Sequence, residues 1–198
     1  MRTCGRCGVK LDPCMRADAR FCSTRCRMAH HRANRLPAEL VGLDRWVRWK
    51  PIRRNSRWTK MPLRPDGRSA SSTDRRTWSS HSGAKAASPD GRLGFVLGAG
   101  VGCIDLDHCL IGDGRTGNAA PTVWAQAVLD SVDTYVEVSP SGDGLHVWGL
   151  LPEAAGRVIR DGRSIEVYAT ARFMTVTGLR WGKAPSHLAD LSGLVESL

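Results

Sequence analysis

The chain has 198 residues, which is enough for one medium domain and a small appendage. Hydrophobic residues make up 41% of the composition, as expected for a chain with one ordinary core. The longest weakly polar run, residues 93–104, is interrupted by glycines and is too short to cross a bilayer. Because the first residues contain no apolar signal segment, we expect a cytoplasmic protein with no membrane association.

The net charge of +10 is distributed unevenly along the chain. Residues 1–60 contain 16 Lys and Arg against 4 Asp and Glu, whereas the remainder contains 13 and 15. A localised basic region is typical of proteins that bind nucleic acid, because it attracts backbone phosphates and releases their counterions. A basic surface that only aids solubility would spread its charge more evenly.

Five of the seven cysteines lie within the first 26 residues. Cys4 and Cys7 form one close pair, and Cys22 and Cys26 form another after a gap of fourteen residues. Two close pairs of thiolates suit tetrahedral Zn²⁺, as in a zinc ribbon or knuckle. So small a segment has almost no core, so structural zinc would supply most of its folding free energy. The alternative is a set of reduced cysteines without metal, and Cys14, His30 and His31 are spare candidate ligands.

The chain is expected to contain three regions. Residues 1–36 form the basic zinc knuckle, which ends near Leu36-Pro37 because the residue before a proline avoids the helical conformation. Residues 37–185 form the main domain, and residues 186–198 form a helical tail that begins at Ser186.

Within the main domain the pattern alternates between short strands and helices. A cap at residues 72–74 predicts a short helix to about Ser82. A second helix is predicted over residues 121–132, after a glycine-rich loop at residues 112–118. The expected strands are residues 93–98, 101–107, 134–139, 144–151, 164–169 and 172–177.

Asp105 and Asp107 are the first candidate functional residues. In a strand, side chains alternate between faces, so Ile104 and Leu106 would enter a core while the two carboxylates share the opposite face. Like charges this close repel unless a cation lies between them. Mg²⁺ or Mn²⁺ is the usual occupant, since both prefer oxygen ligands. The alternative is a solvated pair of aspartates just after a strand.

Two further candidates follow along the chain. Residues 139–144 form a glycine-rich turn, and His146 in the next strand alternates with Leu145 and Val147, so it points away from the core face. Glu166 alternates with Ile165 and Val167 in the same way. Either residue would otherwise be an ordinary strand residue with no special role.

This order of motifs resembles the archaeo-eukaryotic primase superfamily, in particular the phage and plasmid primase-polymerases. The likeness spans residues 43–182 and includes the lead-in Trp46-Val47-x-Trp49-Lys50, Lys60-x-Pro62 and Ser72-Thr73-Asp74. The resemblance implies an α+β fold of mixed and antiparallel sheets with flanking helices, an RRM-like catalytic core and a small zinc knuckle.

The resemblance also implies residue roles. Asp105, Asp107 and Glu166 would bind two divalent cations, and His146 would contact the phosphates of the incoming nucleotide. Relatives often have Asp in the third position, and Glu166 offers the same carboxylate on a longer stem. The residues that would shape or line the nucleotide site are Ser141, Gly142, Gly144, Arg172 and Lys60.

The implied activity is two-metal nucleotidyl transfer from dNTPs or NTPs on a single-stranded DNA template in phage or plasmid replication. Tryptophans between residues 46 and 58 would hold the template by stacking and charge. At least one of Trp46 and Trp49 would instead be a core residue. The basic residues interleaved with these tryptophans are Arg48, Lys50, Arg53, Arg54 and Arg57.

Two other functions compete with this reading. The same carboxylates would serve a metal-dependent nuclease, although the chain lacks a His-x-His strand and a Glu-x-Lys motif. The second competing function is that of a non-catalytic, zinc-bearing module that binds single-stranded DNA or has a regulatory role. Because no Gly-x₄-Gly-Lys-Ser/Thr phosphate loop occurs, a helicase would be a separate protein unless the chain is a fragment. We expect a monomer, located in the bacterial host cytoplasm if a phage encodes it.

Overall fold

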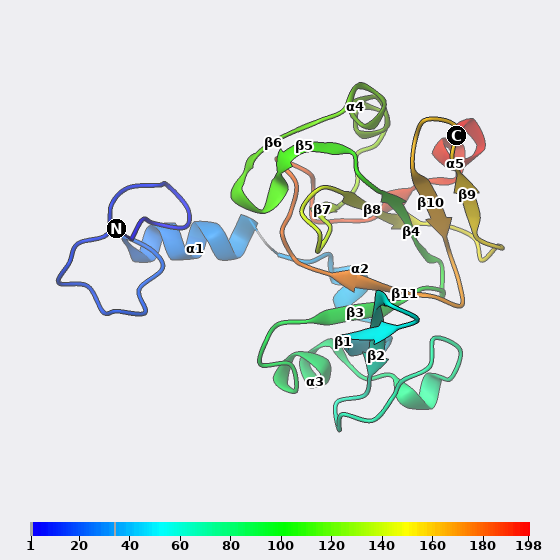
Figure 1. The fold of residues 1–198 in the computed structure, drawn as a ribbon, viewed down its shortest axis with the longest axis horizontal. Helices are drawn as coiled ribbons and strands as arrows, with labels where there is room; N and C mark the ends of the chain where they lie inside the picture. Colours follow the sequence, from blue (N-terminus) through cyan, green and yellow to red (C-terminus); the bar gives the residue numbers. More distant parts are fainter. Residues whose placement is uncertain (1, 34) are drawn as a thin grey trace. The chain divides into compact units, whose positions relative to one another are not determined.

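The structure is a computed structural model that describes residues 2–33 and 35–198, without the side chains of residues 30–33. The chain divides into two compact units, Met1–Arg35 and Leu36–Leu198. The second unit has the predicted α+β fold with mainly antiparallel sheets (Figure 1). The tail from residue 186 belongs to this unit and packs on its core through Leu191, Leu194 and Val195.

The first unit consists of loops followed by α1 (Thr24–Ala33). The Cys4 N–H donates to the Val9 carbonyl at 2.8 Å, and the Gly8 N–H donates to the Cys4 carbonyl at 3.0 Å. Gly8 has φ +72°, a conformation that glycine adopts without a steric penalty. Among the described side chains of this unit, Cys4 and Leu11 are the buried hydrophobic ones, so no ordinary core holds it together.

A six-stranded sheet is the centre of the second unit. Its order is β12-β8-β4-β10-β9, and β7 also pairs with β8. All neighbours are antiparallel except β12 and β8, which are parallel. The strands are β4 (Val101–Leu106), β7 (Val136–Val138), β8 (Leu145–Leu150), β9 (Arg157–Ile159), β10 (Ile165–Tyr168) and β12 (Ala189–Asp190).

A second, four-stranded antiparallel sheet has the order β11-β3-β1-β2. Its strands are β1 (Trp46–Arg54), β2 (Arg57–Leu63), β3 (Leu93–Val96) and β11 (Phe173–Val176). A small separate hairpin joins β5 (Leu110–Asp113) to β6 (Asn118–Pro121).

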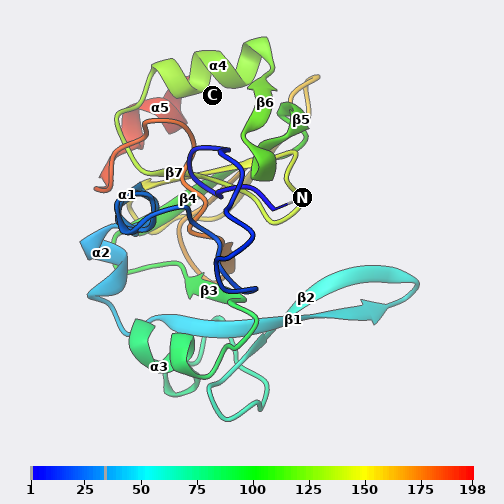
Figure 2. The ribbon, with the colours of Figure 1, turned by 90° about the vertical axis from the view of Figure 1, so that its left-hand side faces the viewer.

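Two hydrophobic cores lie on opposite faces of the six-stranded sheet. Ile104 and Leu106 of β4 enter the first core, which α4 (Val123–Asp130) and α5 (Ser192–Ser197) cover. Cys103 of β4 enters the second core, where Phe95 of β3 and Trp148 of β8 join the two sheets. Figures 1 and 2 show the helices α4 and α5 on one side of the large sheet and the smaller sheet on the other.

The remaining helices are short. They are α2 (Ala38–Val41), α3 (His81–Ala86) and the 3₁₀ turns η1 (Arg75–Thr77) and η2 (Gly114–Thr116). Within the described part of the chain, no helix combines the length and the apolar character that crossing a bilayer requires.

The β1–β2 hairpin is the largest element that the sequence analysis missed. Its two-residue turn has positive φ at both Asn55 (45°) and Ser56 (64°), and Arg54 lies opposite Arg57. Figure 2 shows the hairpin as an arm that extends beyond the strands beside it. Its many cations and the prolines Pro51 and Pro62 conceal the alternating pattern that identifies a strand.

Several predicted boundaries are wrong. The helix expected from the cap at residues 72–74 is two pieces, because Asp74 accepts from the Arg76 N–H and closes only a 3₁₀ turn. The tail helix starts at Ser192 because residues 189–190 pair with β8 first. The predicted glycine-rich loop at residues 112–118 includes the ends of the β5–β6 hairpin, and Pro121 ends β6 instead of beginning α4.

Candidate active site and metal cluster

Four ionisable side chains lie in one row across the six-stranded sheet. Glu137 of β7 lies opposite His146 of β8. His146 in turn lies opposite Asp105 of β4, and Asp105 lies opposite Glu166 of β10. Residues opposite one another in adjacent strands share a sheet face. The register therefore brings three sequence-predicted site residues together and adds Glu137, which the sequence analysis did not single out.

Asp105 has an unsatisfied oxygen in a buried position. Its side chain is 18% exposed, and Oδ1 is buried and makes no hydrogen bond. Oδ1 lies 3.7 Å from His146 Nε2. Burial raises the pKa of the Asp105 carboxyl, and the nearby His146 acts in the opposite direction. An anionic oxygen without a donor suits a ligand of a hard divalent cation such as Mg²⁺ or Mn²⁺.

Asp107 lies immediately beyond β4, which ends at Leu106 and not at residue 107 as predicted. Its N–H donates to the Ser164 carbonyl at 2.9 Å, so the backbone pairing continues past the strand end. Burial is the main cause of the raised pKa of Asp105, and the negative charge of Asp107 adds to it.

Glu166 is paired with cations of the chain itself. Arg160 contacts Oε1 at 2.5 Å, the Tyr168 hydroxyl donates to Oε2 at 2.7 Å, and Arg172 lies 3.7 Å from Oε2. Partial burial acts to raise the pKa of Glu166, but these partners outweigh it and lower the pKa. Both oxygens are thus occupied, and a metal ion would have to displace Arg160 or Tyr168.

His146 is buried, with 1% of its surface exposed. Its neighbours Leu145 and Val147 enter the core under α4 and α5, so His146 points to the opposite face as predicted. The second sheet covers that face, which the sequence did not indicate, and this is why His146 is not a surface residue. Nδ1 lies 3.2 Å from Glu137 Oε1.

The glycine-rich turn packs against the end of β4. The Ser139 N–H donates to the Gly144 carbonyl at 2.9 Å, and Ser141 is exposed. A Cβ on Gly144 would lie 2.8 Å from the Leu106 carbonyl oxygen, and Gly142 has φ +91°. The turn therefore requires both glycines, Gly144 because it packs beside Asp107 and Gly142 because of its positive φ.

The turn is also tied to the residue after Asp107. His108 Nδ1 and Asp143 Oδ2 lie 2.6 Å apart, a pair that the sequence analysis missed. This contact raises the pKa of His108. Hydrogen bonds from Ser141 and His108 lower the pKa of Asp143. The pair fixes the turn next to the strand that carries the two aspartates.

An open pocket of 550 Å³ lies where the two sheets meet. Asp105 of β4 lines it together with Lys60 of β2 and Arg172, which immediately precedes β11. Desolvation lowers the pKa of Lys60, while Asp105 and Asp107 act in the opposite direction. The Arg172 guanidinium also stacks 4.0 Å from the centre of the Tyr168 ring. The other lining residues are Trp58, Thr59, Ser72, Ala171, Phe173, Met174 and Thr175.

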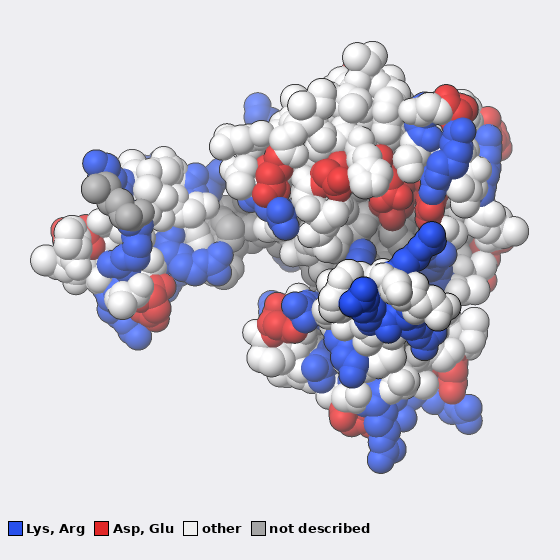
Figure 3. All heavy atoms as spheres, in the orientation of Figure 1, with Lys and Arg blue, Asp and Glu red and all other residues white. Residues whose placement is uncertain are grey.

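Basic side chains gather over the β1–β2 hairpin, as Figure 3 shows. The exposed ones are Lys50, Arg53, Arg54, Arg57 and Lys60. Arg48 is half-buried and donates to the Pro65 carbonyl at 3.3 Å. Trp46 is fully buried in the second core. This confirms the prediction that at least one of Trp46 and Trp49 is a core residue. Trp58 is 73% exposed and lines the pocket.

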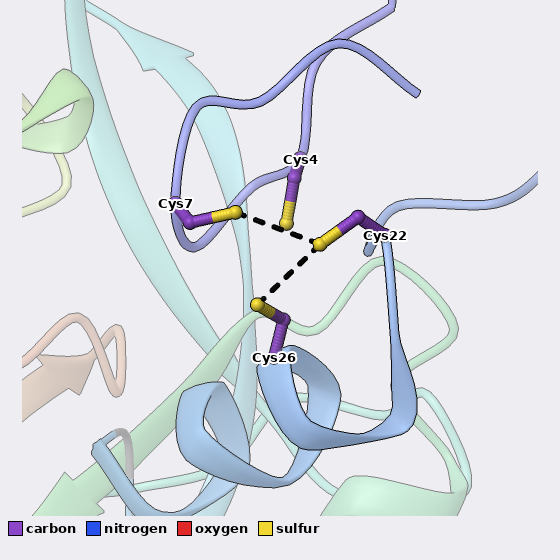
Figure 4. A group of neighbouring side chains, drawn as sticks. All are labelled: Cys4, Cys7, Cys22 and Cys26. Carbon is purple, nitrogen blue, oxygen red and sulfur yellow. Dashed lines mark hydrogen bonds between the residues drawn. The ribbon is translucent and has the colours of Figure 1, made fainter. Parts of the chain in front are cut away.

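The four cysteines of the first unit point toward one another (Figure 4). Their sulfur atoms all lie within 4.8 Å of each other, and Cys22 lies 3.5 Å from both Cys7 and Cys26. Tetrahedral zinc with bonds of about 2.3 Å places sulfurs about 3.8 Å apart, so this cluster fits a structural metal ion. Among the described residues, no other group of ligand atoms is this compact, and the three carboxylates are not gathered around one point.

The pKa values of two thiols of this cluster, Cys4 and Cys22, are shifted in opposite directions. Backbone hydrogen bonds, first from Cys22, lower the pKa of Cys4 to about 6. The neighbouring thiols, Cys26 above all, raise the pKa of Cys22 to about 12. A bound cation would remove this difference in pKa, because it stabilises the thiolate form of every cysteine in the cluster. Cys14 is exposed and outside the cluster, and the side chains of His30 and His31 lie outside the described residues.

No family model matches the chain. The DNA primase-polymerase of Nitratiruptor phage NrS-1 is 40% identical to it over 144 residues, which cover 67% of the chain. The chain is a relative of phage primase-polymerases. This similarity confirms the resemblance that the motifs indicated. The match covers 19% of the phage protein, so this primase-polymerase relative is much longer than the chain.

Proposed function

We propose that the second unit is a primase-polymerase domain that transfers nucleotides from dNTPs or NTPs on a single-stranded DNA template. The observation that carries the proposal is the buried, unsatisfied Oδ1 of Asp105 beside a pocket lined by Lys60 and Arg172. An anionic oxygen for a metal ion next to two cations for phosphate is the combination that nucleotidyl transfer needs. The phage relative supports the assignment.

Asp105, Asp107 and Glu166 would hold two Mg²⁺ or Mn²⁺ ions. When bound, such ions activate the attacking 3′-oxygen and stabilise the leaving pyrophosphate. Glu166 would exchange its contact with Arg160 for the metal, since Arg160 contacts one of its oxygens and is itself about half exposed. The released Arg160 stays near the site, where its charge favours a triphosphate.

The side chains of the pocket would bind and orient the nucleotide. Lys60 and Arg172 supply positive charge on the wall that belongs to the smaller sheet. His146 does not line the pocket itself, but it presents Nε2 toward Asp105 and would contact a phosphate bound at that carboxylate. Holding the triphosphate in line with the template-bound primer is the main contribution that a protein makes to this reaction.

The β1–β2 hairpin would hold the template. Trp58 is exposed at the pocket, so it can stack on a base close to the carboxylates. Arg53, Arg54 and Arg57 lie at the hairpin tip and would contact backbone phosphates. In the first unit, Zn²⁺ bound by the four cysteines would have a structural role.

The test is primer synthesis and extension on single-stranded DNA with Mg²⁺ or Mn²⁺. Wild type is compared with Asp105→Ala/Asp107→Ala and with the matched control Asp130→Ala/Asp133→Ala. The control removes the same charge from two exposed residues at the end of α4, on the opposite side of the sheet. We expect products from wild type and the control and none from the active-site variant.

Other outcomes favour the competing functions. Tight single-strand binding by all three proteins without any product would support a non-catalytic binding module. Degradation of the template by wild type and the control alone would indicate a metal-dependent nuclease at the same carboxylates.

A further inference from the structure

Glu137 is a fully buried carboxylate that neither the motifs nor the proposed chemistry uses. Its side chain is 0% exposed and lies in β7, next to His146 in the register. Burying an ionised carboxylate is costly unless hydrogen-bond donors surround it. A buried charge at the end of the row of ionisable side chains therefore requires a reason.

Three hydrogen-bond donors and one histidine nitrogen surround this carboxylate. The backbone N–H groups of Thr177 and Gly178 donate to it, the first at 3.2 Å and the second at 2.8 Å. The Tyr135 hydroxyl donates to Oε2 at 3.1 Å. His146 Nδ1 is the fourth neighbour, 3.2 Å from Oε1. Backbone N–H groups can only donate, so both carboxylate oxygens of Glu137 act as acceptors in these contacts.

The acceptor role of Glu137 determines the tautomer of His146. A carboxylate without a proton can contact Nδ1 favourably only if Nδ1 carries the hydrogen. The ring is then oriented with Nε2 toward Asp105, at 3.7 Å from Oδ1. The edge of Trp148 limits ring rotation further, with ring centroids 6.3 Å apart at an angle of 83°.

We propose that Glu137 is a positioning residue that holds His146 with Nδ1 protonated and Nε2 directed at the metal and nucleotide site. This inference rests on the proposed function, because it assigns the purpose of the fixed ring to contact with the nucleotide phosphates. The arrangement parallels carboxylate–histidine pairs at metal sites, where a carboxylate outside the coordination sphere fixes the orientation of the histidine ring that binds the metal.

The first test needs no variant. In protein labelled with ¹⁵N at histidine, the ring nitrogen shifts of His146, identified by the loss of its signals in His146→Ala, should show a proton on Nδ1. An unprotonated Nδ1 would overturn the proposal. This reading does not depend on activity, so it stays informative if the chain proves not to be a polymerase.

The second test is a double-mutant cycle in primer extension. Glu137→Gln places an amide N–H₂ donor in the cavity, which competes with Nδ1–H and disturbs the ring. We expect KM for the nucleotide to rise about tenfold, the effect of one lost charge-assisted hydrogen bond, with a smaller change in kcat. In a His146→Ala background the same substitution should change KM no further.

A merely structural role gives a different result. If Glu137 only anchors residues 177–178, Glu137→Gln would reduce activity by the same factor with and without His146, and additivity would overturn the proposal. Thermal unfolding of each variant accompanies the kinetics. Absence of extension by wild type would count against the proposed function, and the histidine shifts would then decide the positioning role alone.

Discussion

The two units of this chain reach a defined structure by different means. In Met1–Arg35, the buried hydrophobic side chains among those described are Cys4 and Leu11, and four thiols lie within 4.8 Å of one another. In Leu36–Leu198, two hydrophobic cores lie on opposite faces of one sheet. The described side chains of the first unit form no ordinary hydrophobic core, so we expect a metal ion to stabilise it, whereas the larger unit depends on apolar burial.

The units differ in charge as well. The first unit has 9 Lys and Arg against 2 Asp and Glu, a strongly basic balance for its size. The second unit is nearly balanced, but it separates its charges in space, with carboxylates on one sheet and cations on the hairpin of the other. Uniform charge suits attraction to nucleic acid, whereas separated charge suits chemistry at a defined position.

Metal removal gives the largest expected difference between the units. Zinc contributes about 10–16 kcal/mol to folding in comparable small sites, so a strong chelator or Cys22→Ser should unfold the first unit completely. Circular dichroism and hydrogen exchange would measure the loss. Cys14→Ser is the matched control, because Cys14 is exposed and lies outside the cluster. Unfolding of both units by chelation would contradict the expectation that only the first unit needs a metal ion to fold.

Shortening a core side chain should destabilise the second unit and leave the first unit unchanged. Phe95 is fully buried and contacts Trp46 and Trp148 edge to face, at centroid distances of 5.4 and 6.1 Å. Phe95→Ala should destabilise the second unit by about 3–5 kcal/mol, because it leaves a cavity between the two sheets. Phe95→Leu should cost less. Denaturant unfolding measures both, and zinc content should remain unchanged.

Neutralising the hairpin tip tests whether spatially separated charge binds the template. Arg53→Ala/Arg54→Ala/Arg57→Ala should weaken single-strand binding and reduce the slope of log K against log salt by about 2, since each phosphate contact contributes about 0.7. The control replaces three exposed arginines outside the hairpin, Arg68, Arg75 and Arg76. Equal slopes for the two variants would mean that the hairpin has no special part in binding.

The smallest expected effect concerns the partner of Glu166. Arg160→Gln removes the cation that contacts Oε1, so a metal ion would meet less competition. We expect the Mn²⁺ concentration for half-maximal extension to fall by about threefold, in keeping with a partly exposed ion pair. Arg157→Gln serves as control, because Arg157 donates to the Val195 carbonyl instead. A higher Mn²⁺ requirement would contradict the proposal that Glu166 exchanges its contact with Arg160 for a metal ion.

Some features of the site follow from short stretches of sequence. The alternation around residues 104–107 predicts that Ile104 and Leu106 are buried while Asp105 faces the other side, and the structure agrees. The cysteine spacing predicts the cluster, since the first pair spans one tight turn and Cys26 lies within α1, one turn after Cys22. These inferences succeed because the interacting residues are close along the chain.

Other features depend on strand pairing. Glu137 looks like an ordinary strand residue until β7 pairs with β8 and brings it to His146. The hairpin that carries Lys60 and Trp58 reaches Asp105 only because a second sheet packs against the first. Packing also decides that His146 is buried and that Arg160 pairs with Glu166.

The sequence by itself therefore determined the cysteine cluster and the alternation that buries Ile104 and Leu106 and turns Asp105 to the opposite face, because each depends on local spacing. The α+β class followed from the family resemblance that the motifs carry. Only the tertiary structure decided the register that aligns Glu137, His146, Asp105 and Glu166. Strand register is a long-range choice made by packing of whole sheet faces, and a shift by one residue would turn every one of these side chains to the other face.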